Sequence, residues 1–342
     1  MKCLVWHGSE GVKYEDRPVP ELQEDEILLK VAYVGICGSE MSIINGHFTH
    51  GIQPPQILGH EFSGTVAKLG KNVKGFSVGE RITAHPLAGC GECYFCKRAQ
   101  EHFCLNPFTT ITVKRAGAFA EYTPIKVKST FKLPEWMSLK VAAMIEPISI
   151  AVHAFSLIHH KPGDTIAILG GGAIGLCCLL VAAHFGSGKI ILSDPIKSRL
   201  AVAKKLGADI VVDPSSEDLK NAVMSATDGF GVDLCIEAAG REETCSQVLS
   251  VTKNAGTVLI VGVVPPSKQI PISFGEINKR EISIIGSNWS PYSFDRTISL
   301  MQKLNVEPII SHEFPLSEYR KAFAIQGKEG IRTVFKVDEA AV

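Results

Sequence analysis

The sequence predicts an α/β protein in which a doubly wound parallel sheet accompanies an irregular, β-rich part. In residues 1–35 and 62–84, short β-type runs alternate with glycine and proline turns. From Asp164 onward, apolar strand segments alternate with helical segments, which is typical of a parallel sheet. Because domains average about 150 residues, a chain of 342 residues is expected to hold two.

The predicted strands of the parallel sheet are short and rich in β-branched residues. They cover residues 165–169, 189–193, 210–212, 233–236, 257–261 and 282–285. Helices are predicted between them at 173–185 and 197–206, and this alternation suits a doubly wound sheet. Outside the sheet, we predict a helix over 137–158 that is broken at Pro147, a helix near 294–304 and a strand near 333–337.

Charge and hydropathy exclude several classes of partner. The chain carries 35 basic and 35 acidic residues, which gives no reason to expect binding to nucleic acid or to an anionic membrane. No stretch approaches the roughly 18 uninterrupted apolar residues of a membrane span, and the N-terminal apolar run is too short for a signal peptide. We therefore expect a soluble cytoplasmic protein, with neither nucleic acid nor membrane as a partner.

Four of the ten cysteines are clustered, at Cys90, Cys93, Cys96 and Cys104. Four thiolates suit a tetrahedral zinc ion, and a site with four protein ligands and no open position is structural. Disulfides and an iron–sulfur cluster are the alternatives. Reducing conditions in the cytoplasm argue against disulfides, and the spacing differs from the common ferredoxin patterns. We predict a structural zinc site.

A glycine-rich segment, Gly170 to Gly175, follows the first strand of the parallel sheet and precedes a helix. In this context its Gly-x-Gly-x-x-Gly pattern predicts a dinucleotide site. Gly170 is expected to make the turn, Gly172 to let the backbone approach a pyrophosphate, and Gly175 to let the helix pack on the sheet.

Asp194 ends the second strand of the sheet and is the candidate partner of the adenosine ribose. A carboxylate there accepts hydrogen bonds from the ribose hydroxyls and repels a 2′-phosphate, which favours NAD over NADP. Arg199 is a candidate contact for the adenosine end. The alternative is that Asp194 is only a turn residue before Pro195.

The segment Gly59-His60-Glu61 is a candidate for a second metal site. Neutral imidazole is the commonest protein ligand for transition metals, although a histidine beside a glutamate is usually a surface pair. Cys37 upstream and the four cysteines downstream favour the metal interpretation.

With these motifs in this order, the chain resembles the zinc-dependent medium-chain dehydrogenases along its whole length. The matching pattern is Gly59-His60-Glu61-x2-Gly64-x5-Gly70-x2-Val73, followed by the cysteine cluster and the dinucleotide loop. Ile36-Cys37-Gly38-Ser39 and Glu146-Pro147 are most similar to the sorbitol (polyol) and threonine dehydrogenase branch. The resemblance implies a GroES-like catalytic domain over residues 1–152 and 289–342, interrupted by an NAD-binding Rossmann domain over 153–288.

The resemblance also implies roles for particular residues. Cys37 and His60 correspond to ligands of a catalytic zinc. Glu61 corresponds to a direct ligand in polyol dehydrogenases, and Glu146 to a residue that binds zinc directly or through a water molecule; we expect Glu61 to be the ligand at rest. Ser39 is expected to receive the substrate proton. The expected cofactor-binding residues are Gly170, Gly172, Ile174, Gly175, Asp194, Arg199, Val261, Gly262, Val263, Ser287 and Asn288.

The implied activity is hydride transfer from a secondary alcohol, a polyol or sugar alcohol, to NAD, which gives a ketone. The resemblance implies two zinc ions per chain and a homodimer or homotetramer. The alternatives are a polyol-phosphate or L-threonine 3-dehydrogenase, a zinc-free quinone-type reductase, and a non-catalytic dinucleotide-sensing protein. The metal-ligand residues argue against the last two.

Two departures from the polyol dehydrogenase pattern affect these expectations. Glu40 and Ser42 stand where an aspartate and a histidine are usual, so a proton relay would need His47 or His50 instead. Trp289-Ser290 replaces an arginine–tyrosine pair that contacts sugar hydroxyls, which argues against sorbitol itself as the substrate.

Overall fold

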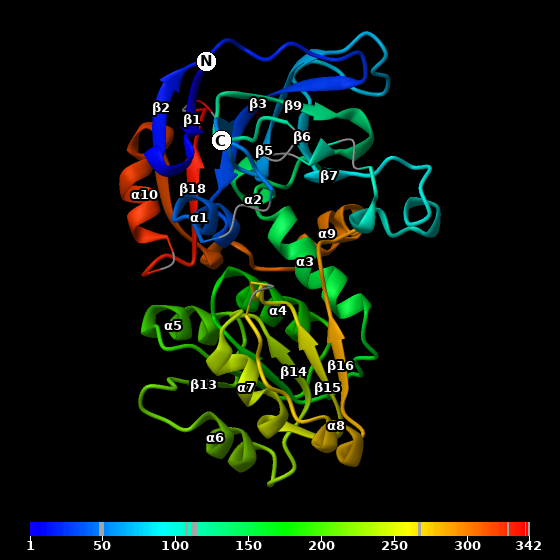
Figure 1. The fold of residues 1–342 in the computed structure, drawn as a ribbon, viewed down its shortest axis with the longest axis vertical. Helices are drawn as coiled ribbons and strands as arrows, with labels where there is room; N and C mark the ends of the chain where they lie inside the picture. Colours follow the sequence, from blue (N-terminus) through cyan, green and yellow to red (C-terminus); the bar gives the residue numbers. More distant parts are fainter. Residues whose placement is uncertain are drawn as a thin grey trace. The chain divides into compact units, whose positions relative to one another are not determined.

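A computed structural model describes residues 1–47, 51–106, 109–110, 115–265, 268–326, 328–338 and 340. The chain forms two compact units. The first contains Met1–Glu146, Phe294–Gln302 and Ile310–Val342, and the second contains Pro147–Ser293 and Lys303–Ile309. The blue N-terminal strands and the red strand β18 therefore belong to the same unit (Figure 1). The predicted limits at 152 and 288 remain a prediction of domain boundaries.

The first unit is built on a mixed sheet that, in the described residues, has seven strands in the order β10-β6-β5-β3-β18-β17, with β9 on β3. A smaller sheet has the order β2-β1-β4, and β7 pairs with β8. The strands are β1 (Lys2–Trp6), β2 (Val12–Asp16), β3 (Glu26–Gly35), β4 (Gln56–Ile57), β5 (Glu61–Leu69), β6 (Arg81–Ala84), β7 (Leu87–Ala88), β8 (Thr109–Thr110), β9 (Tyr122–Lys126), β10 (Thr130–Lys132), β17 (Ile310–Pro315) and β18 (Arg332–Lys336).

The core of this unit lies between the sheets and the helices of the same unit. Phe119 and Phe335 are buried there with their ring centroids 5.4 Å apart, in an edge-to-face arrangement. The helices are α1 (Gly38–Ile44), α2 (Leu139–Ala142), α9 (Phe294–Met301) and α10 (Tyr319–Ile325). Because β18 pairs with the central strand β3, the last segment of the chain is an integral part of this core.

The second unit contains a parallel sheet of six described strands in the order β13-β12-β11-β14-β15-β16. The strands are β11 (Ile166–Leu169), β12 (Ile190–Ser193), β13 (Ile210–Val212), β14 (Val232–Glu237), β15 (Thr252–Ile260) and β16 (Ser283–Gly286). The connecting helices are α4 (Ala173–His184), α5 (Lys197–Lys205), α6 (Leu219–Ala226), α7 (Glu242–Val251) and α8 (Phe274–Arg280). The strand order reverses between β11 and β14, which confirms the predicted doubly wound sheet.

One predicted element was wrong in detail. Residues 137–158 form α2 and a separate helix, α3 (Ile145–Ser156), that continues through Pro147. Pro147 lies in the first turn of α3, where a backbone N–H would have no partner within the helix, so proline does not break it. The interruption falls instead at Ala143 and Met144. The described part of the chain contains no helix able to span a membrane.

The sheet explains why the predicted motif contains glycine at residue 64. Gly64 lies on β5 between β3 and β6, opposite Val31 and Ile82. A Cβ at this position would lie 2.0 Å from the main-chain oxygen of Lys30, which a real structure cannot accommodate without moving the strand.

We predict that Gly64→Ala lowers the free energy of unfolding by about 1–3 kcal/mol, because the added methyl group forces β3 and β5 apart. The matched control is Gly38→Ala at the start of α1, where no atom lies within 4 Å of the added Cβ. Thermal unfolding of both variants tests this. Equal melting temperatures for Gly64→Ala and Gly38→Ala would contradict the packing argument.

Candidate active site and cysteine loop

The structure brings together three of the predicted ligands, Cys37, His60 and Glu61. Among the described residues, their ligand atoms form a group in which all lie within 4.8 Å of one another. Ligands at 2.0–2.3 Å from a single ion lie roughly 3–4 Å apart, so the group has the size and the donor types of a zinc site.

The pairing of strands positions these ligands. Gly35 ends β3 opposite Glu61 on β5, and the chain then turns through Ile36 to Cys37, the residue that precedes α1. A Cβ at Gly35 would lie 2.5 Å from Glu61 Oε2, so the absence of a side chain makes room for the carboxylate. His60 immediately precedes β5. The register of two neighbouring strands thus places residues 37 and 61 at the same end of the sheet.

The carboxylate of Glu61 is fully buried and poorly satisfied. Neither of its oxygens has a hydrogen-bond donor in the structure. Arg332 Nη1 lies 3.0 Å from Oε2, an ion pair that compensates charge, and the same nitrogen donates a hydrogen bond to the Ile36 carbonyl at 2.6 Å. Burial raises the pKa of Glu61 although Arg332 and His60 act to lower it. A buried carboxylate that has one ion pair but no hydrogen bond is costly, and a metal cation would satisfy its oxygens.

Glu40 is a site residue that sequence reasoning had considered only as a departure from the family pattern. One carboxylate oxygen accepts a hydrogen bond from the Cys37 amide at 2.7 Å, and the other contacts His60 Nδ1. Burial alone would lower the pKa of His60, but Glu40 and Cys37 raise it well above its usual range. With Nδ1 held by Glu40, Nε2 is the nitrogen available to a metal. The spacing Cys37-x-x-Glu40 is that of a capping box and was the available signal.

Glu146 is close enough to His60 and Glu61 for their charges to affect its pKa, but it does not belong to the group formed by Cys37, His60 and Glu61. It lies in the first turn of α3, and burial raises its pKa to about 7, with Glu61 adding to the increase and His60 opposing it. Ser39 is half-buried in the first turn of α1. His47 is exposed after α1, and His50 lies outside the described residues.

The cysteine loop, residues 89–104, gathers its four sulfurs within 4.8 Å of one another. The Sγ atoms of Cys93 and Cys104 are 3.9 Å apart, as are those of Cys90 and Cys96. Four sulfurs at about 2.3 Å from a tetrahedral ion would lie about 3.8 Å apart. All ten cysteines are described and are free thiols, which argues against the disulfide alternative.

Main-chain N–H groups donate hydrogen bonds to sulfur atoms of the cysteine loop, which favours the negatively charged thiolates. Cys90 N donates to Cys104 Sγ at 3.2 Å, and Cys93 N donates to Cys90 Sγ at 3.3 Å. Hydrogen bonds from the amides of Cys96 and Leu105 lower the pKa of Cys93 to about 6, whereas burial raises the pKa of Cys96 to about 12. Because the thiolate is the form of cysteine that binds metal, four clustered sulfurs that accept main-chain N–H hydrogen bonds fit a site for a metal cation.

In the second unit, the glycine loop has the geometry that its pattern predicts. Gly170 follows β11 with φ +109°, a conformation that favours glycine. A Cβ at Gly175 would lie 1.8 Å from the Gly170 carbonyl oxygen, so α4 can pack here only without a side chain. Gly172 precedes α4 and has no atom within 4 Å of an added Cβ. This open approach to the helix N-terminus fits a phosphate group.

Asp194 connects the second strand to that loop. Its Oδ2 accepts a hydrogen bond from Gly171 N at 2.8 Å and lies 3.4 Å from Arg199 Nη1, while Oδ1 accepts from Ile196 N at 2.8 Å. Ile174 lies in the first turn of α4. The remaining expected cofactor residues follow the carboxyl ends of parallel strands, where ligands of doubly wound sheets bind. They are Val261, Gly262 and Val263 after β15, and Ser287 and Asn288 after β16.

Two families of known proteins match the chain, one mainly over the first unit and one mainly over the second. The alcohol dehydrogenase GroES-like domain family matches residues 23–135, and the zinc-binding dehydrogenase family matches residues 173–303. D-arabitol-phosphate dehydrogenase of Enterococcus avium is 37% identical over 94% of this chain and 93% of its own. Sorbitol dehydrogenase of Bacillus subtilis is 36% identical over 84% of this chain and 81% of its own.

A solved structure extends the agreement to three dimensions. A Sinorhizobium meliloti protein described as a zinc-binding dehydrogenase bound to NADP superimposes with a TM-score of 0.93 and 31% identity, covering 98% of this chain and 99% of its own. The chain therefore belongs to the zinc-dependent medium-chain dehydrogenases, in the branch of the polyol and threonine dehydrogenases.

Proposed function

We propose that the protein is a zinc- and NAD-dependent dehydrogenase that oxidises a secondary alcohol of a polyol to a ketone. The observation that carries this proposal is the group formed by Cys37, His60 and Glu61, in which a buried carboxylate lacks a hydrogen-bond donor. The polyol dehydrogenases among the relatives support the substrate class.

Zinc held by these three residues would supply a Lewis acid beside the substrate hydroxyl, and bound NAD would accept the hydride. The chain's own residues orient the reaction. Glu40 fixes the ring of His60 through Nδ1. Ser39, in the first turn of α1, is proposed to take the hydroxyl proton. Glu146 is proposed to interact with the zinc from outside the three ligands, directly or through a water molecule.

The preference for NAD rests on Asp194. Its carboxylate is fixed at the end of β12 by three partners, so its charge is available at a defined place to repel a 2′-phosphate. We propose that Gly170, Gly172, Ile174 and Gly175 hold the pyrophosphate side. The Sinorhizobium protein is described with NADP, so the relatives do not decide this preference.

We further propose a second, structural zinc in the cysteine loop and a cytoplasmic location, where thiols stay reduced. We also propose that the protein forms a homo-oligomer, on the basis of an edge strand in the second unit. Strand β16 is an edge of its sheet, and Ile284 on it is 39% exposed. An exposed apolar edge strand is a template for pairing with another copy.

A polyol phosphate is the second candidate substrate, because D-arabitol-phosphate dehydrogenase is 37% identical to this chain; L-threonine is the third. Zinc- and NAD-loaded enzyme assayed for NADH formation on short polyols, their phosphates and threonine separates the three. The proposal requires the highest kcat/KM on an unphosphorylated polyol. A higher value on a phosphorylated one would replace it.

Loss of a ligand in the group of three should abolish turnover. In Cys37→Ser and His60→Ala we expect kcat to fall by about 10³-fold or more, because a Lewis acid supplies several kcal/mol of transition-state stabilisation. Zinc content should fall from two to one per chain, and NAD affinity should be retained. Elemental analysis, NADH absorbance and NAD titration measure these. Full activity in a zinc-depleted Cys37→Ser enzyme would refute the assignment.

The cysteine loop should contribute stability rather than chemistry. In Cys93→Ser we expect loss of the other zinc and a melting temperature lower by several degrees, since a structural metal contributes folding free energy. Cys245→Ser is the control, because Cys245 is half-buried on α7 and belongs to neither group of metal-ligand residues. Unchanged zinc content in Cys93→Ser would count against a structural site.

Asp194→Asn keeps the shape of the side chain but removes its charge. We expect the ratio of kcat/KM for NAD over NADP to fall by about tenfold, which corresponds to about 1.4 kcal/mol. Asp209→Asn is a matched control, because Asp209 also accepts a main-chain amide hydrogen bond, from Ile190 at 2.7 Å. An unchanged cofactor ratio in Asp194→Asn would show that the carboxylate does not select NAD.

A further inference from the structure

Gly89, the residue before the first cysteine of the cysteine loop, is buried and held at both of its main-chain polar groups. Its carbonyl accepts a hydrogen bond from the Lys128 ammonium, and its amide donates to Glu101 Oε2 at 3.4 Å. A Cβ at Gly89 would lie 2.8 Å from Cys96 Sγ. The chain is therefore closely fixed where it enters the loop.

The peptide group that joins Gly89 to Cys90 connects Lys128 to a cysteine sulfur. Its oxygen accepts the hydrogen bond from Lys128, and its N–H donates to Cys104 Sγ at 3.2 Å. Hydrogen bonds in a chain polarise one another, and bonds from charged donors are the stronger ones. A cationic donor at the oxygen therefore strengthens the bond that the N–H makes to the sulfur.

The segment that carries Lys128 is itself firmly held. It is a short 3₁₀ turn, η4 (Val127–Ser129), between β9 and β10. Val127 N donates to the Asp25 carbonyl at 3.1 Å, and the Ser129 carbonyl accepts from His85 N at 2.8 Å. Both sides of Lys128 are thus tied to the sheet of the first unit.

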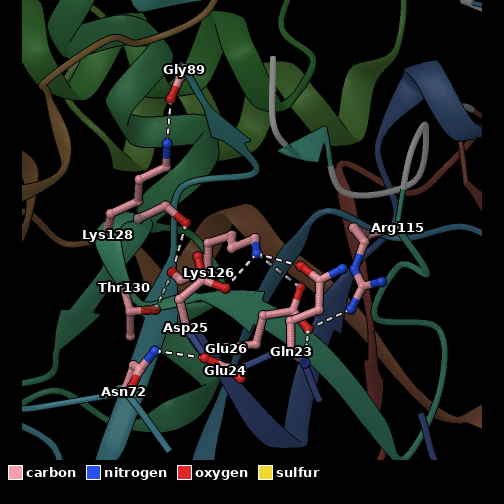
Figure 2. Close-up of polar contacts among 11 residues, drawn as sticks. Gln23, Glu24, Asp25, Glu26, Asn72, Gly89, Arg115, Lys126, Lys128 and Thr130 are labelled. Atoms are coloured by element: carbon pink, nitrogen blue, oxygen red, sulfur yellow. Dashed lines mark hydrogen bonds and ion pairs between the residues drawn. The ribbon is translucent and has the colours of Figure 1, made fainter. Parts of the chain in front are cut away.

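Charged groups fix the residue before this turn (Figure 2). Lys126 is buried, and its Nζ donates to Gln23 Oε1 and to Asp25 Oδ1, both at 2.6 Å. Glu26, which is fully buried, lies 3.6 Å from the same Nζ and 2.5 Å from Arg115 Nη2. Figure 2 shows Lys128 extending from this network to Gly89. These contacts fix the main chain from which the Lys128 side chain extends.

We propose that Lys128 is a positioning residue of the four-cysteine metal site, acting through the Gly89–Cys90 peptide group on the sulfur of Cys104. The inference rests on the proposed structural zinc. Lys128 is not one of the metal-ligand residues; it holds the Gly89–Cys90 peptide group so that the N–H of this group points at Cys104 Sγ, and it thereby fixes the entry of the chain into the loop. Its charge also opposes the increase that burial causes in the pKa of Glu101, the other partner of Gly89.

The alternative is that Lys128 is an ordinary exposed lysine whose contact contributes little to stability or metal binding, as is usual for surface ion pairs. Three variants of the full-length, zinc-loaded protein separate the two readings. Lys128→Met keeps the aliphatic stem without the charge, and Lys128→Arg restores a cationic donor. Lys132→Met is the control, because Lys132 lies nearby on β10 but contacts Glu80, at 2.8 Å, and the ring of Phe76, and neither belongs to the cysteine loop.

The measurement is the rate of zinc transfer to a chromogenic chelator, made in a Cys37→Ser background so that the cysteine loop is the source of the metal. Partners that orient metal ligands typically change affinity by 10–100-fold, and we expect release from Lys128→Met to be about tenfold faster. Lys128→Arg and Lys132→Met should release zinc at the rate of the parent.

Equal release from Lys128→Met and the parent would overturn the inference while leaving the structural zinc in place. Fast release from Lys128→Arg would overturn the role of the positive charge. Metal analysis before the chelator is added keeps the two proposals apart. A parent protein with no zinc in the loop would refute the structural site itself, and the role of Lys128 with it.

Discussion

A buried carboxylate without a hydrogen-bond donor is the constraint on which the catalytic part of the first unit depends. Glu61 is fully buried and makes no hydrogen bond, and its charge is compensated by an ion pair with Arg332 at 3.0 Å. Leaving such a group unsatisfied would cost the fold several kcal/mol. A cation coordinated by Cys37, His60 and Glu61 removes that cost, so metal binding and the stability of this region are coupled.

The surrounding structure serves to hold that arrangement. Gly35 leaves room for the carboxylate, and the pairing of β3 with β5 and β18 brings Cys37, Glu61 and Arg332 together. Glu40 then fixes both the start of α1 and the ring of His60. A substrate hydroxyl at this site would meet a preorganised set of groups, which is the condition for electrostatic catalysis. The second unit keeps its glycine loop equally fixed through Asp194.

The sequence was informative where chemistry depends on neighbours in the chain. The alternation of strands and helices, the glycine loop and the four cysteines are local patterns; they predicted the doubly wound sheet and the clustering of the four cysteines, whereas Cys37, His60 and Glu61 were grouped only through the resemblance to the family. Pro147 was misjudged because its effect depends on its position within a helix. Arg332, Lys128 and the second contact of Glu40 were not predicted. Each acts on a residue distant in the chain, and only the strand register brings them together.

The most direct test is anomalous diffraction at the zinc edge from crystals of the zinc-loaded, full-length protein. We predict two zinc peaks per chain: one among the four cysteine sulfurs, and one at about 2.0–2.2 Å from a Glu61 oxygen, with Cys37 and His60 completing its protein ligands. A zinc ion bound to Cys37 and His60 with the Glu61 carboxylate turned away onto Arg332 would contradict metal binding by Glu61, as would the absence of zinc at this site.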